Sequence, residues 1–103
     1  MNRIEIIEIR ANHKAKEKLE TELKRILNEI SKEAGSPELK IYSRINLETD
    51  FVILIMNSSG PANNGESRLG ILLNEGLKDY GLVNYSKWNE FTSDEAYPVK
   101  LRK

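Results

Sequence analysis

A chain of 103 residues is long enough for one domain with a single hydrophobic core and too short for two. Its 16 basic and 16 acidic residues cancel, so no overall charge attracts nucleic acid or an anionic membrane. The absence of cysteine excludes disulfides, thiolate nucleophiles and zinc sites built on sulfur. No stretch approaches the roughly 20 apolar residues of a membrane span, and we expect a soluble cytoplasmic protein.

The first predicted elements are a strand and an amphipathic helix. Residues 3–10 alternate, with isoleucine on both parities, which favours a central β-strand. Asn12 is placed to cap the helix, and Gly35 is expected to end it. The apolar residues of the helix recur at spacings of three and four: Leu19, Leu23, Ile26, Leu27, Ile30 and Ala34.

The stretch from Leu39 to Met56 predicts an antiparallel hairpin around which the other elements are organised. Residues 39–47 alternate between apolar and polar, whereas residues 51–56 contain no polar side chain. Residues 48–50 form a connection too short for a crossover, so the two arms should pair directly. Because the second arm is apolar on both faces, we expect a central strand that is covered on both sides.

The face on which each hairpin side chain lies depends on the length of the connection. With two or four residues, Tyr42, Arg44 and Asn46 share a face with the odd-numbered residues of the second arm. A three-residue loop reverses this assignment, because a slip of one residue moves every side chain to the other face. Glu-Thr is not a favoured two-residue turn. We take the even-numbered connection as the preferred hypothesis.

Turn-forming residues at 57–65 follow the hairpin and lead into a second helix. This connection is either a plain linker or a lid over a pocket, since it is longer than usual. Gly70 and Gly76 weaken the helix, each by roughly 1 kcal/mol relative to alanine unless close packing requires them. The apolar stripe of the helix consists of Leu69, Leu72, Leu73, Leu77 and Tyr80.

The last predicted element is a strand over residues 82–91, with Tyr85 and Trp88 on opposite faces. The resulting order, βαββαβ, predicts a single ferredoxin-like α+β domain over residues 1–91. Its four-stranded antiparallel sheet should carry both helices on one face, because connections of this type are right-handed. Residues 92–103 are expected to form a C-terminal tail or an added edge strand.

This order and the doubly apolar central strands, over roughly residues 3–91, resemble the dimeric α/β-barrel superfamily. In that superfamily two ferredoxin-like subunits pack sheet against sheet. Its members include small cofactor-independent monooxygenases of the antibiotic-biosynthesis type, haem-degrading proteins and many uncharacterised proteins. The resemblance implies a homodimer that binds or transforms a small, partly aromatic metabolite, with a monooxygenase-like reaction as one option. It is a resemblance of architecture and brings no specific motif.

The candidate site residues come from the hairpin and from the only histidine. Tyr42, Arg44 and Asn46 are the predicted ligand-binding residues, with Arg44 suited to a carboxylate or enolate oxygen and the other two to hydrogen bonds. Arg44 and His13 are the candidate catalytic residues, since an imidazole exchanges protons near neutral pH. All four also fit a purely structural role. One histidine without an acidic cluster makes a metal site unexpected, and we expect no cofactor.

Two other functions fit the same pattern. A non-enzymatic regulatory or assembly module would use the open sheet face only to join subunits. RNA binding on that face would require exposed aromatic side chains on adjacent central strands, for which only Phe51 and Tyr42 qualify, and the neutral net charge counts against it. We therefore expect a second copy of the chain and a small molecule as partners, without nucleic acid or membrane.

Overall fold

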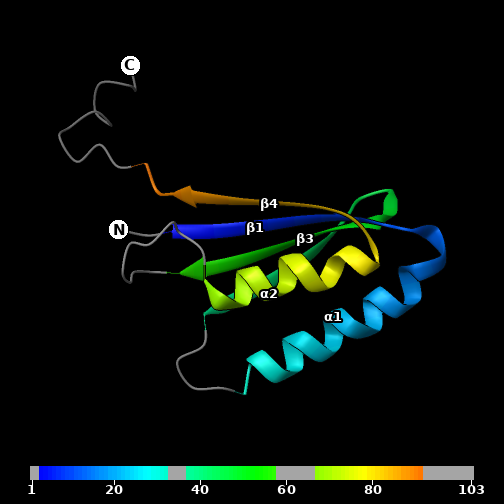
Figure 1. Cartoon of the computed structure of the whole chain (residues 1–103), viewed down its shortest axis with the longest axis horizontal. Helices are drawn as coiled ribbons and strands as arrows, with labels where there is room; N and C mark the ends of the chain where they lie inside the picture. The colour runs from blue at the N-terminus through cyan, green and yellow to red at the C-terminus, as the bar shows by residue number, and fades with distance from the viewer. Residues whose placement is uncertain (1–2, 33–36, 58–66, 92–103) are drawn as a thin grey trace.

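The computed structural model describes residues 3–32, 37–57 and 67–91, which form a four-stranded antiparallel sheet and two α-helices (Figure 1). In chain order the elements are β1 (Arg3–Ala11), the 3-10 turn η1 (His13–Ala15), α1 (Lys16–Ile30), β2 (Glu38–Arg44), β3 (Leu47–Asn57), α2 (Arg68–Gly76), the 3-10 turn η2 (Leu77–Asp79) and β4 (Gly81–Asn89). The strand order β2-β3-β1-β4 is that of a ferredoxin-like fold. The predicted fold class is confirmed. Within the described ranges, no helix is long and apolar enough to cross a membrane.

The two strands with apolar residues on both parities, β1 and β3, occupy the centre of the sheet, as predicted. Both helices lie on one side of the sheet (Figure 1). The side chains between helices and sheet form one core, in which Ile7, Ile53 and Ile55 have no exposed surface. The buried apolar residues of this core are Ile7, Ile9, Ala11, Leu19, Leu23, Ile26, Ile53, Ile55, Leu73 and Leu77.

The start of the first helical segment is capped as predicted. The side chain of Asn12 accepts a hydrogen bond of 2.9 Å from the backbone N–H of Lys14. The backbone N–H of Asn12 donates to the carbonyl of Tyr80 at 2.7 Å. The cap opens η1, which continues into α1. Helix α1 ends at Ile30, and the predicted stop at Gly35 lies outside the described residues.

A buried carboxylate joins β1 to the start of α2. Glu5 is fully buried, and its Oε1 accepts hydrogen bonds from the Tyr85 hydroxyl at 2.5 Å and from the Ser67 N–H at 3.1 Å. A Cβ atom at Gly70 would lie 1.9 Å from the same oxygen. Gly70 is therefore required by close packing, whereas a Cβ at Gly76 would meet nothing within 4 Å.

The hairpin turns at a different place from the predicted one. Its tip is Ile45-Asn46, and Asn46 has a φ of 66°, a left-handed conformation that asparagine tolerates better than most residues. Residues 48–50, predicted as the connection, belong to β3. The pairing shifts there, from Arg44 opposite Leu47 to Ser43 opposite Phe51, so three residues of β3 have no partner on β2.

This shift makes the preferred face assignment wrong. Tyr42 is paired with Val52 and Ile41 with Ile53, so Tyr42 lies on the face opposite to the odd-numbered residues of β3. Three unmatched residues change the alternation of side chains as a three-residue loop would. The side chains of β2 therefore lie on the faces that the alternative hypothesis, a three-residue loop, predicted. Tyr42 consequently lies on the face turned away from the helices.

Candidate functional site

The sheet face turned away from the helices, called here the open face, carries the even-numbered side chains of β1, β2 and β4 and those of residues 50–56 in β3. Its half farther from the hairpin tip is mostly apolar, and we call six residues there the apolar half: Ile4, Ile6, Val52, Leu54, Met56 and Trp88. Five of these side chains are partly buried by their neighbours, but Trp88 is 56% exposed. Lys40 and Tyr42 of β2 lie opposite Leu54 and Val52 on this half. Within the described residues, no element covers this surface.

The half of the open face nearer the hairpin tip is polar. We call its five charged and amide residues the polar end: Glu8, Arg10, Arg44, Asp50 and Asn84. They come from all four strands and are brought together by the antiparallel register, which places Arg10 opposite Asp50 and Glu8 opposite Asn84. The polar end is thus a product of tertiary structure.

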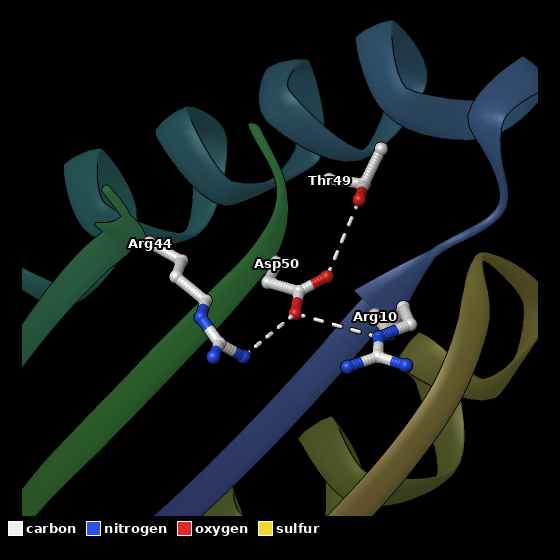
Figure 2. A network of polar contacts seen from close by, with 4 residues as sticks. All are labelled: Arg10, Arg44, Thr49 and Asp50. Atoms are coloured by element: carbon white, nitrogen blue, oxygen red, sulfur yellow. Dashed lines mark hydrogen bonds and ion pairs between the residues drawn. The ribbon is translucent and has the colours of Figure 1, made fainter. Parts of the chain in front are cut away.

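Asp50 is the centre of the polar end. Its Oδ2 lies 3.4 Å from Arg10 Nε and 3.4 Å from Arg44 Nη1, so two guanidinium groups share one carboxylate oxygen. Figure 2 shows the two arginines on opposite sides of Asp50, one from β1 and one from β2. The second oxygen, Oδ1, accepts a hydrogen bond of 3.2 Å from the Thr49 hydroxyl.

The three unmatched residues of β3 are Glu48, Thr49 and Asp50 itself, and their contacts hold the Asp50 carboxylate in place. Thr49 orients Asp50, and Glu48 pairs with Lys16 of α1, at 3.1 Å between Oε1 and Nζ. Lys16 also pairs with Glu20, and the hydrogen bonds that the Lys16 ammonium donates to Glu48 and then to Glu20 raise its pKa. Of the three unmatched residues, Glu48 therefore contacts the first helix, whereas Thr49 and Asp50 contribute to the polar end.

A hollow of about 620 Å³ lies at the polar end. All five polar-end residues line it, together with apolar surface from Val52 and Leu82. Within the hollow, Asn84 Nδ2 donates a 3.2 Å hydrogen bond to Glu8 Oε1. Small-ligand pockets combine apolar walls with a few convergent polar groups, and this hollow has both.

The structure separates the four predicted site residues. Arg44 lines the hollow, and Tyr42 lies one position along the same face, beside Val52. Asn46 is exposed at the hairpin tip, and His13 is exposed in η1; neither lines the hollow. The predicted loop at 57–65 falls, from residue 58 on, outside the described residues, as does the tail at 92–103.

Sequence reasoning missed four residues of the polar end. Glu8 and Arg10 interrupt the even-numbered isoleucines of a central strand, a signal that could have marked a polar patch on the open face. Asp50 was assigned to a turn, and Asn84 carries no local signal. Within residues 3–32, 37–57 and 67–91, no three histidine, aspartate or glutamate side chains gather as a metal ion would require.

A second, smaller hollow of about 330 Å³ lies between the two helices. Its walls include Ile26, Leu69 and Leu73, and its rim carries Arg25 between Glu22 and Glu29. Arg25 makes hydrogen bonds to both carboxylates, which raise the pKa of its guanidinium and leave it engaged within the chain. This rim therefore presents no unengaged cation to a ligand.

The chain was compared with protein-family models, with curated proteins and with solved structures, and none of the three comparisons gave a match.

Proposed function

We propose that this chain forms a homodimer of the dimeric α/β-barrel type, which binds or transforms a small, partly aromatic metabolite at the polar end of the open face. The observation that carries the proposal is the contrast within that face. None of the elements in the described ranges covers its apolar half, and apolar sheet faces are normally covered by another layer. A second sheet packed on the apolar half would wall the adjoining hollow.

The chemistry of the hollow supports a ligand with an anionic or enolisable group. Arg10 and Arg44 can stabilise negative charge on oxygen, as a carboxylate or an enolate. Glu8 supplies a carboxylate within the hollow that can accept a proton, whereas His13 lies outside it. A cofactor-independent oxygenation would require the substrate itself to reduce oxygen as a stabilised carbanion, for which the protein would supply deprotonation and charge stabilisation.

The dimer is tested by changing one exposed apolar residue on each side of the molecule. Trp88→Glu places a charge in the apolar half, while Leu72→Glu places one on α2, where the side chain is 58% exposed. We expect the wild type and Leu72→Glu to be dimers by sedimentation velocity and Trp88→Glu to be monomeric, because a buried unpaired charge is costly. A monomeric wild type would contradict the proposal, as would a dimer that survives Trp88→Glu.

A second candidate function is a non-enzymatic assembly module. It is favoured by the pairing of charges within the polar end, where the two arginines share Asp50 and Asn84 binds Glu8, as at the polar rim of a protein interface. Native mass spectrometry of gently purified protein separates the two functions. Retained small-molecule mass supports the metabolite-binding protein, and dimers without affinity for small carboxylates support the module.

A further inference from the structure

Arg10 and Arg44 of the polar end both bind Asp50, and we call this pair of arginines the clamp. Their arrangement indicates which chemical group of a ligand they bind. We infer that the ligand of the hollow is recognised through a carboxylate that binds Arg10 and Arg44 together, and that Asp50 positions both guanidinium groups for it. This inference rests on the proposed function, since it concerns the same hollow. It extends the site to residues that sequence reasoning did not select and names the chemical class of the ligand.

The charged side chains of the polar end differ in how deeply they are buried. The Asp50 side chain is 13% exposed, whereas those of Arg10 and Arg44 are 63% and 62% exposed. The acid is therefore less accessible than the two cations, and an incoming ligand meets the guanidinium groups before it meets Asp50. The same burial keeps the contact between Asp50 and the guanidinium groups from being fully screened by water.

Both guanidinium groups keep N–H donors that Asp50 does not use. A guanidinium has five N–H donors in a planar fork. Arg10 uses Nε and Arg44 uses Nη1 for Asp50, and within the described part of the chain no other side-chain hydrogen bond or ion pair involves either residue. Both side chains line the hollow. Two planar guanidinium groups on opposite sides of one position match a carboxylate, because each carboxylate oxygen accepts two hydrogen bonds.

The residues around the two arginines restrict the rest of the ligand. Glu8 lies two residues from Arg10 on the same face, a spacing of about 7 Å along a strand. Its charge disfavours a second anionic group on the ligand, while its oxygen can accept a hydrogen bond. Val52 and Leu82 add apolar surface to the hollow. The ligand class is therefore a monocarboxylate with an apolar or aromatic body, rather than a phosphate.

The probe is 3-phenylpropionate, and its uncharged isostere 3-phenylpropionamide is the matched control. Both are titrated into the 15N-labelled full chain at low salt, with the arginine Nε–Hε signals and the backbone amides of β1 and β3 as readouts. We expect the carboxylate to shift the signals of Arg10 and Arg44 and to bind at least tenfold more tightly than the amide. Equal binding of the two probes overturns the clamp, as does tighter binding of inorganic phosphate.

Two variants with a control locate the binding. Arg10→Gln and Arg44→Gln should each weaken 3-phenylpropionate binding about tenfold, the size expected for losing one charge-assisted hydrogen bond. Lys24→Gln removes the same charge from the exposed surface of α1 and should leave the affinity unchanged. If all three variants weaken binding equally, general charge attraction explains it and the clamp is wrong.

The Asp50→Asn variant tests whether Asp50 positions the two arginines, because the sign of the change in 3-phenylpropionate affinity differs between the two explanations. Removing a negative charge next to an anion site should strengthen binding if charge alone acts. Loss of positioning should weaken it several-fold and shift both arginine Nε–Hε signals in the free protein, while thermal unfolding confirms that the variant is folded. Tighter binding by Asp50→Asn overturns the positioning role.

The experiments distinguish failure of the clamp from failure of the proposed function. A dimer that binds 3-phenylpropionate, but is insensitive to Arg10→Gln and Arg44→Gln, leaves the metabolite-binding function standing and overturns the clamp. A monomer whose polar-end signals do not respond to the probe, up to its solubility limit, overturns both.

Discussion

The two faces of the sheet are built from the same strands but are covered very differently. On the helix face, Ile7 and Ile53 have no exposed surface, because α1 and α2 pack over them. On the open face, Ile6 remains partly exposed, and Trp88 is 56% exposed. The helix face therefore carries the stability of the single chain. The candidate site lies on the open face, which no element in the described part of the chain covers.

The largest expected effect tests this contrast with two adjacent residues of one type. Ile7→Ala should lower the free energy of unfolding by about 2–5 kcal/mol, since it leaves a cavity beneath the helices. Ile6→Ala, on the open face, should cost roughly 1 kcal/mol in dilute solution. Urea denaturation measures both. If a second copy covers Ile6, the cost of Ile6→Ala should grow with protein concentration. If both variants lose the same free energy of unfolding at all protein concentrations, the two faces do not differ in how they are covered.

The next effect concerns the two glycines of α2. Gly70→Ala should destabilise by about 1–3 kcal/mol, because its Cβ would press on the buried Glu5 carboxylate. Gly76 has φ −68° and ψ −32° and open space around it, so Gly76→Ala should stabilise by up to about 1 kcal/mol through helix propensity. Thermal unfolding of both variants should show shifts of opposite sign. A stabilising Gly70→Ala would disprove the contact with Glu5.

A smaller effect separates binding from stability. Arg44→Gln should change the free energy of unfolding by less than about 0.5 kcal/mol, because its ion pair with Asp50 is long and its side chain is exposed. The same variant should weaken the carboxylate binding proposed above about tenfold. Chemical denaturation and the probe titration on one sample measure both quantities. A large loss of stability would show that the polar end belongs to the structural framework rather than to a site.

The smallest expected effect depends on pH and lies on the outer surface of α1. Hydrogen bonds from Arg25 lower the pKa of Glu22 below its ordinary value of 4.5. Stability from this pair is fully present above that value and is lost as the pH falls through the lowered pKa. The thermal midpoint of the wild type should therefore fall slightly more steeply below pH 4.5 than that of Glu22→Gln. Parallel curves would show that the pair contributes nothing to stability.

Much of the fold could be predicted because its signals are local. Isoleucine on both parities placed β1 in the centre of the sheet, and spacings of three and four placed Leu19, Leu23 and Ile26 against it. The helix prediction was less accurate at its edges: Leu27 is 37% exposed, since it lies at the margin of the apolar stripe. The candidate site was predicted less well, because Arg44 alone of the four proposed residues lines the hollow.

The periodicities could be identified from the sequence alone, and with them the βαββαβ order, the central strands and the cap at Asn12. Only the tertiary structure decided the hairpin register and the membership of the polar end. Alternation along a strand shows which side chains share a face but not which of the two faces they share, and three unmatched residues at 48–50 reverse the answer. Arg10 and Asp50 are 40 positions apart, so their contact exists only once β1 and β3 have paired.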